Sequence, residues 1–133
     1  MNLMQAVHQR WAAATALNAV LPATRVFTGM SCDSSLPRAS ITKQSDKPTS
    51  YASDGSAIDA VAVRIVVFHD HYDAATEIIH QVKATFDRSS FALSGGDQVQ
   101  LMQRVNDFEE QLDDGTWQMT VDFGCTVYLA AGV

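Results

Sequence analysis

Apolar residues recur at helical spacing in two segments of the chain. In the first, they return every three or four residues, which places Leu3, Val7, Trp11, Ala14, Leu17 and Leu21 on one face. We expect one helix from Leu3 to Leu21, ended by Pro22 because a proline ring clashes with the preceding helical turn. The second segment predicts another helix with the buried stripe Tyr72, Ala75, Ile79, Val82 and Phe86.

Other segments alternate apolar and polar residues with period two, which is typical of half-buried strands. The clearest are 57–69 and 116–129, and in the latter the apolar set is Trp117, Met119, Val121, Phe123, Cys125, Val127 and Leu129. Residues 98–106 also alternate, with Val99, Leu101 and Val105 on one predicted face and Met102 on the other. Shorter extended pieces are expected at 25–28 and 36–43.

The segments between these elements are rich in turn-forming residues. Residues 44–56 carry Ser, Thr, Asp, Gly and Pro without any period, which predicts a long loop, and long loops are often functional. Tyr51 is the one aromatic residue in that loop, so we expect it either to pack on the loop itself or to contact a partner. Residues 87–97 are expected to form a loop, and 107–114 an acidic turn region that ends in a hairpin signal, Asp114–Gly115.

This order of elements predicts a single α+β domain over residues 1–133. We expect a mostly antiparallel sheet of about four to five strands with two helices packed on it. The longest strands exceed the body of such a domain: its radius of gyration should be roughly 14 Å, whereas fourteen extended residues span roughly 46 Å. The strands must therefore bend or project, and a projecting strand with unpaired backbone groups favours pairing with a neighbouring subunit.

Composition narrows the classes of partner. The chain has 133 residues, 15 acidic and 9 basic, for a net charge of −6. The basic residues are scattered, which disfavours direct nucleic-acid recognition. Every apolar stretch is too short for a membrane helix, so a membrane partner is not expected. Cys32 and Cys125 are isolated, which predicts a reduced intracellular protein in which Cys125 is a small buried apolar residue.

Two groups of residues invite a chemical interpretation. His69, His71 and Asp73 match the HxHxD part of a metal-hydrolase signature, but Ala74 stands where that signature has another histidine. The favoured alternative is a strand-to-helix junction with solvent-exposed histidines and an Asp70 or Asp73 cap. The second group is acidic and consists of Asp107, Glu109, Glu110, Asp113 and Asp114. It lacks the residue spacing of a calcium-binding EF-hand loop. Nucleophile elbows and phosphate-binding loops are missing from the sequence. We therefore expect no enzyme, no metal and no cofactor.

Two surfaces remain as candidates for protein contacts. The first is the 44–56 loop, in which Lys47, Tyr51 and Asp54 are the expected contact residues. The second is an acidic docking surface formed by Asp107, Glu109, Glu110 and Asp113. Both interpretations assign the function to surface complementarity rather than to catalysis.

The whole chain, in order, resembles the tail-terminator and tail-completion proteins of long-tailed bacteriophages. The resemblance is carried by the amphipathic helix from Leu3 to Leu21, the short strand Arg25–Val26–Phe27 and the strand 36–41 (Leu-Pro-Arg-Ala-Ser-Ile). It continues through the polar stretch into strand 57–69, and from there directly into the second helix. It ends with two strands joined by an acidic turn and Asp114–Gly115–Thr116–Trp117.

The resemblance implies a structural virion subunit that forms a hexameric ring. Such a ring caps the tail tube, ends tail polymerisation and offers the head–tail joining surface. The implied partners are further copies of the chain, the tail tube protein and a neck or head-completion protein. The implied location is the tail–neck junction of the virion, after assembly in the host cytoplasm. The alternatives are a head-completion or neck protein, a small metal-dependent enzyme, and an adaptor that binds one basic protein through its acidic surface.

Overall fold

A computed structural model of the chain describes residues 2–29 and 35–131. In chain order, its elements are α1 (Leu3–Ala13), α2 (Thr15–Val20), β1 (Val26–Thr28), β2 (Arg38–Tyr51), β3 (Ala57–His69), α3 (Tyr72–Phe86), β4 (Ser89–Ala92), β5 (Gln98–Gln111) and β6 (Trp117–Leu129), with 3-10 turns at Ala23–Arg25 and Ser94–Gly96. None of the helices in these ranges is both long and apolar enough to cross a membrane.

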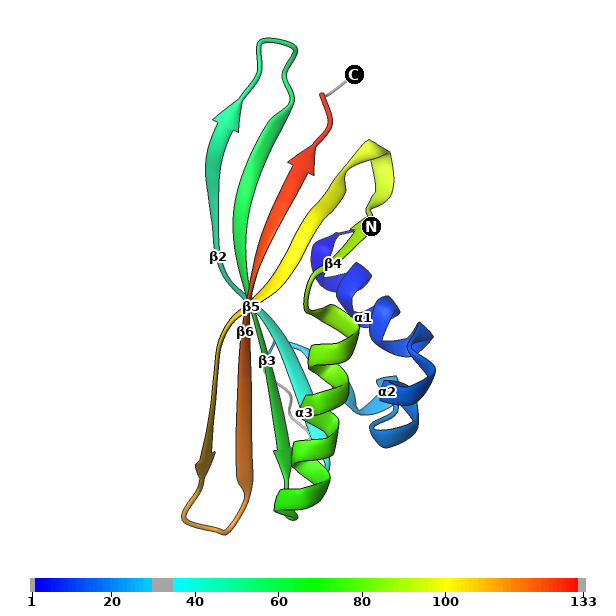
Figure 1. Ribbon diagram of the computed structural model, residues 1–133, viewed down its shortest axis with the longest axis vertical. Coiled ribbons are helices and arrows are strands. Elements are labelled where there is room, and N and C mark those ends of the chain that lie inside the picture. Colours follow the sequence, from blue (N-terminus) through cyan, green and yellow to red (C-terminus); the bar gives the residue numbers. More distant parts are fainter. Residues whose placement is uncertain (1, 30–34, 132–133) are drawn as a thin grey trace.

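The strands form one curled six-stranded sheet in the order β1-β2-β3-β6-β5-β4, and the helices lie on one side of it (Figure 1). The expected α+β class is confirmed. The expectation of a mostly antiparallel sheet with four to five strands and two helices is wrong. The sheet has six strands and is mixed, because β1 runs parallel to β2 while the other strand pairs are antiparallel.

The third helix arises because the predicted first helix is broken at Ala14. Asn2 and Gln5 begin α1 with a reciprocal capping box, in which the Asn2 side chain accepts the Gln5 N–H at 2.8 Å. Ala14 is extended, with ψ of 100°, so the chain turns and starts α2 in a new direction. The turn brings Leu21 next to Trp11, and the Trp11 indole N–H donates to the Leu21 carbonyl at 2.9 Å.

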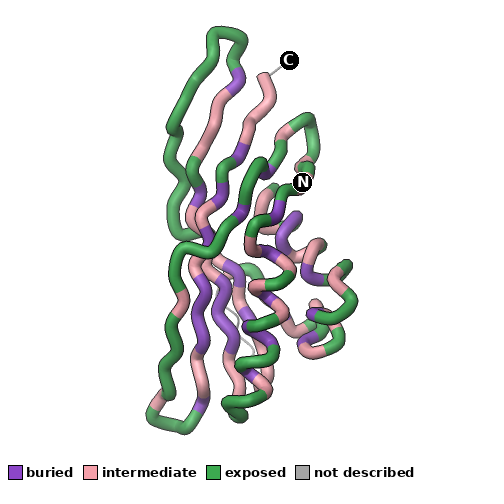
Figure 2. Tube along the Cα trace, in the orientation of Figure 1, coloured by how far each residue is buried: buried purple, intermediate pink, exposed green. Residues whose placement is uncertain are grey.

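The core lies between the helices and one face of the sheet (Figure 2). Trp11 of α1, Phe86 of α3 and Phe123 of β6 are fully buried and form a chain of aromatic contacts. Their ring centroids lie 6.3 Å apart for Trp11–Phe86 and 6.1 Å apart for Phe86–Phe123. The predicted period-two face of 116–129 is confirmed over its central part, because Met119, Val121, Phe123, Cys125 and Val127 are all buried.

Residues 44–56 do not form the expected long loop. Residues 44–51 belong to β2 and pair with β3, and only residues 52–56 form a turn. Likewise, β5 continues through the predicted acidic turn region as far as Gln111. The result is two long hairpins, β2–β3 and β5–β6, that point to opposite ends of the molecule (Figure 1).

Two register shifts change the predicted faces of β5. The first lies between Val99 and Leu101, the second between Arg104 and Asn106, and each adds one residue to β5 relative to β6. Val99 and Met102 are therefore both buried, whereas Leu101 and Val105 are exposed. The expectation that Leu101 and Val105 share the buried face of Val99 is wrong. The predicted 87–97 loop also contains a short strand, β4, which pairs with the first part of β5.

Candidate assembly surfaces

The His69–Asp73 segment forms a local junction between β3 and α3. The backbone N–H of His71 donates to Nδ1 of His69 at 2.9 Å, and their ring centroids lie 5.8 Å apart. His71 occupies the N-cap position without a side-chain cap bond, so the expected Asp70 or Asp73 cap is wrong. Within residues 2–29 and 35–131, no three His, Cys, Asp or Glu side chains are grouped so that they could hold a metal ion.

Cys125 lies in the buried face of β6, as predicted, whereas Cys32 falls outside the described residues. Burial raises the pKa of the Cys125 thiol to about 12. The thiol therefore stays protonated at neutral pH and unreactive in the folded protein.

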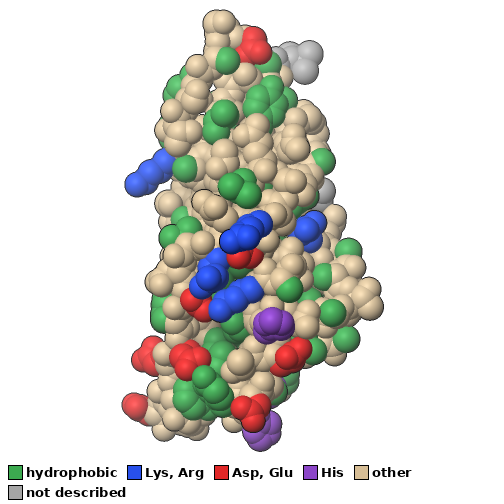
Figure 3. Space-filling model, viewed as in Figure 1, with side chains coloured by type: hydrophobic (Ala, Val, Ile, Leu, Met, Phe, Trp, Pro, Cys, Tyr) green, Lys and Arg blue, Asp and Glu red, His purple; other side chains and the backbone are tan. Residues whose placement is uncertain are grey.

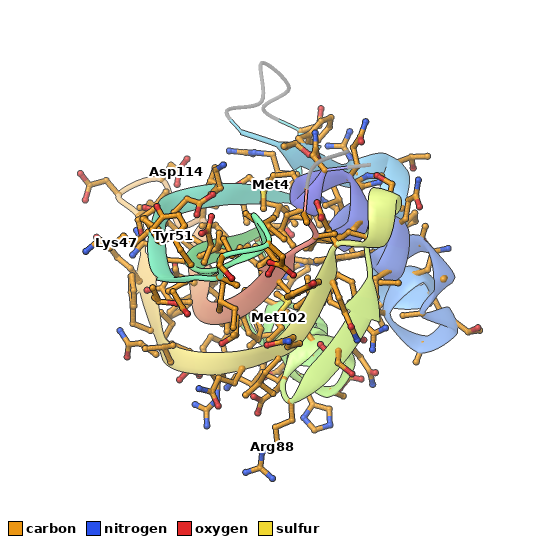
Figure 4. All side chains as sticks on the ribbon, turned by 90° about the horizontal axis from the view of Figure 1, so that it is seen from above. Met4, Lys47, Tyr51, Arg88, Met102 and Asp114 are labelled. Carbon is orange, nitrogen blue, oxygen red and sulfur yellow. The ribbon has the colours of Figure 1, made fainter. Side chains whose placement is uncertain are left out.

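The end of the β2–β3 hairpin is exposed to solvent along its length. Residues 43–55 are all exposed, and Tyr51 keeps 76% of its surface accessible. Lys47 points away from the body of the molecule (Figure 4). An aromatic ring this exposed on a strand gains little from the chain's own packing, which favours a contact outside the chain.

Asp54 has a structural task in the same hairpin. Its carboxylate accepts the backbone N–H of Ser56 at 2.9 Å and the Ser56 hydroxyl at 2.7 Å, and these bonds lower the pKa of Asp54. Gly55 follows with φ of +92°, a conformation that favours glycine. Asp54 thus fixes the turn, while Lys47 and Tyr51 remain available for a partner.

The four predicted acidic residues gather at the β5–β6 end of the molecule, but two of them have partners within the chain. Asp107 pairs with Lys83 and with Arg104, and the hydrogen bond from Lys83, assisted by Arg104, lowers the pKa of Asp107. Glu109 accepts a hydrogen bond from the Tyr72 hydroxyl at 2.9 Å. Glu110 and Asp113 are exposed.

Charge is therefore distributed unevenly along the long axis. Figure 3 shows Lys and Arg side chains gathered near the middle of the visible face and most Asp and Glu side chains toward its lower end. The opposite end, at the tip of the β2–β3 hairpin, shows fewer charged side chains on this face. A partner that recognises one end of the subunit would thus meet different chemistry at the other.

A third surface, which the sequence pattern did not predict, is the sheet face turned away from the helices. Arg64 and Asp122 form a two-point ion pair on it, at 2.8 and 3.1 Å, and the Arg64 guanidinium also lies 5.6 Å from the Phe108 ring centroid. Leu101, Val105 and Phe108 are 37%, 69% and 44% exposed on β5. Their placement depends on the two register shifts, which a strict period-two reading cannot detect.

The middle of this outer face is hollowed. A shallow groove of about 260 Å³ crosses it, because the strands carry small side chains there. Its lining consists of Ser45, Lys47, Ala60, Val61, Ala62, Gln103, Gly124, Cys125 and Thr126. Lys47 is the one charged residue in this lining.

Comparison with known proteins agrees with the features described above. The family model described as "Tail completion protein gp17" matches residues 5–128, and the chain belongs to this family. The resemblance seen in the sequence is thereby confirmed, and the chain falls among the structural proteins of phage-type virions. A search of curated proteins finds no significant match.

The fold recurs in a solved virion structure. The matching chain, in a structure titled "Virion of native gene transfer agent (GTA) particle", has a TM-score of 0.76 and 15% sequence identity. The match covers 96% of this chain and 95% of the other, so the two share the fold over almost their full lengths.

Proposed function

We propose that the chain forms a hexameric ring that caps the tail tube, ends its polymerisation and provides the surface to which the head is joined. The observation that carries the proposal is the presence of two chemically different exposed hairpins at opposite ends of one sheet, in a member of the tail completion family. The subunit would act in the virion at the tail–neck junction, after assembly in the host cytoplasm.

The difference between the two ends explains how growth would stop. A tube grows when each newly added ring presents, on its free side, a copy of the surface to which it has just bound. The next ring can then bind in the same way. In this chain, one end presents Tyr51 and Lys47 on a hairpin with charges of both signs, and the other presents Glu110 and Asp113 on an acidic one. A ring that binds the tube through the first end leaves an acidic surface exposed, which a neck or head-completion protein with basic residues would complement.

The direct test is the tail phenotype of a virus or prophage that lacks the gene for this chain. We expect tails of excess and variable length, because nothing stops the tube, and a plasmid-borne copy should restore a single length. Tails of normal length that remain separate from filled heads would contradict termination. That result would assign the chain to the neck or head-completion role instead.

A point variant tests the β2–β3 hairpin in the same assay. Tyr51→Ser should leave the free energy of unfolding within about 0.5 kcal/mol of the parent, because exposed surface positions contribute little to stability. It should fail to restore tail length. The matched control is His80→Ser, which alters an exposed ring on α3 away from both hairpins. Restoration by Tyr51→Ser equal to that by the control would show that the hairpin tip does not contact the tube.

A further inference from the structure

Among the described residues, the short edge strands β1 and β4 leave a long stretch of the neighbouring strand uncovered on each side of the sheet. At one edge, β1 covers only Ala39–Ile41 of β2, so the part of β2 from Thr42 onward has no strand beside it among the described residues. At the other edge, β4 pairs with β5 only as far as Met102. An Asp87 side-chain oxygen accepts the Arg104 N–H at 2.8 Å, and beyond it Asn106–Gln111 has no strand beside it among the described residues on that side.

These free stretches belong to different strands and extend from the middle of the sheet toward its opposite ends (Figure 1). An unpaired strand edge offers a row of backbone donors and acceptors to any other strand, and monomeric proteins usually guard such edges. Pro48 guards the distal part of β2, because proline cannot donate to a ladder. Thr42–Lys47, which comes before it, contains no proline, and neither does Asn106–Gln111.

The two stretches are complementary in direction, length and charge. Three successive antiparallel pairings, β2–β3, β3–β6 and β6–β5, make β2 and β5 run in opposite directions. When two copies lie side by side in the same orientation, β2 of one therefore meets β5 of the other antiparallel. Both stretches have six residues, and in the former the register shift between Lys43 and Ser45 adds one residue relative to β3. The former has two lysines and one aspartate, and the latter has three acidic residues, of which Asp107 is already neutralised by Lys83 and Arg104.

We infer that Thr42–Lys47 of one copy pairs antiparallel with Asn106–Gln111 of the next copy, which makes the sheet continuous between subunits. The inference deepens the proposed ring and rests on it. Because the paired edges differ, the contact is heterologous, and a heterologous contact gives a ring when the rotation between copies closes. The free stretches extend from the middle of the sheet in opposite directions, so each copy is shifted along its strands relative to the last. In closed sheets, such a stagger is accommodated by a tilt of the strands relative to the axis of the ring.

The same pairing joins the outer faces of neighbouring sheets. Ser45 pairs with Ala62 and Asn106 with Asp122, and both partners lie on the face turned away from the helices. β2 has a register shift between Lys43 and Ser45, so the register is set beyond it, where Ser45 lies opposite Phe108 and Lys47 opposite Asn106. In that register, Ser45 and Asn106 are diagonal neighbours on one continuous face. Diagonal neighbours in an antiparallel pair lie about 7–8 Å apart, within reach of a short cross-linker.

Cysteine cross-linking of the full-length chain tests the inference. In a Cys32→Ser background, where buried Cys125 is the remaining thiol, Ser45→Cys and Asn106→Cys are introduced singly and together. A short bis-maleimide should link the double variant into a series of covalent oligomers ending at the ring size. Each single variant should stay uncross-linked, because each edge meets the other edge and not itself. A control that combines Ser45→Cys with His80→Cys on α3 should also stay uncross-linked.

The outcomes separate the edge pairing from the ring. A double variant that light scattering shows to be a ring, but that does not cross-link, would overturn the pairing and leave the ring standing. Covalent dimers from either single variant would also overturn the pairing, because they would show that an edge meets the same edge of a second molecule. A chain that stays monomeric at every concentration would overturn both proposals.

Discussion

Replacing Trp11 by Phe should destabilise the protein by about 2–4 kcal/mol. Trp11 is fully buried, and its indole N–H donates to the Leu21 carbonyl at 2.9 Å. Phenylalanine removes the donor and leaves that carbonyl without its partner, which costs about 1–3 kcal/mol. The smaller ring also leaves a cavity against Phe86, whose ring centroid lies 6.3 Å away, and partial collapse of that cavity should leave a further cost of about 1 kcal/mol.

Urea unfolding followed by far-ultraviolet circular dichroism measures this loss, since the helix and sheet signal does not depend on the indole itself. The matched control is Trp117→Phe, at a half-buried ring that packs edge-on against Tyr72 at 4.7 Å between centroids. It should cost clearly less, because the ring keeps one side in solvent. Equal losses for the two variants, or a loss below about 0.5 kcal/mol for Trp11→Phe, would refute the role given to the buried hydrogen bond.

Two further predictions concern single side chains. In the Cys32→Ser background, a thiol-specific maleimide should label Cys125 only after the protein unfolds, because burial holds the pKa of this thiol at about 12. Rapid labelling of the folded protein at pH 7 would contradict this prediction. Asp107→Asn should lower stability by about 0.5–1 kcal/mol at pH 7. Lys83 and Arg104 lower the pKa of Asp107, so its contribution is present above the unfolded value near 4 and is lost as pH falls through the folded value. The difference between parent and variant in thermal unfolding should therefore close at acid pH, and a constant difference from pH 7 to pH 2 would contradict the ion-pair account.

The sequence pattern was sufficient where burial follows a simple period. The strand predicted at 57–69 has those same bounds, and α3 carries four of its five predicted stripe residues in the core. In both elements, one face packs against the rest of the protein, so apolar residues must recur with the period of the element. The whole-chain resemblance used this same order of elements.

The pattern failed where a strand has no buried face. Residues 44–51 are exposed on both faces of the strand, so apolar residues are not required at alternate positions. The sequence of this strand therefore resembles that of a loop. A local signal was present: Asp54–Gly55–Ser56 repeats the turn chemistry of Asp114–Gly115–Thr116. Both turns use an Asp side chain to accept the N–H two residues later, at 2.9 Å. This repeat identifies a second hairpin.

The candidate surfaces were predicted in part for the same reason. Tyr51 was expected to have a partner because it is the one aromatic residue in a polar stretch, and the structure leaves both Tyr51 and Lys47 exposed. The apolar outer face with Val105 and Phe108 was missed, because two register shifts exchange the faces of β5 and only three-dimensional pairing reveals them. The free sheet edges, likewise, depend on strand order, which periodicity does not encode.

The most direct test of the ring is the mass of the purified full-length chain in solution, measured by light scattering coupled to size exclusion over a wide range of concentrations. The account predicts a species of the mass of a hexamer that becomes dominant as concentration rises. Because the paired edges are different, dimers should not accumulate as an end point. A stable dimer, or a monomer at every concentration, would contradict a closed ring built from heterologous contacts.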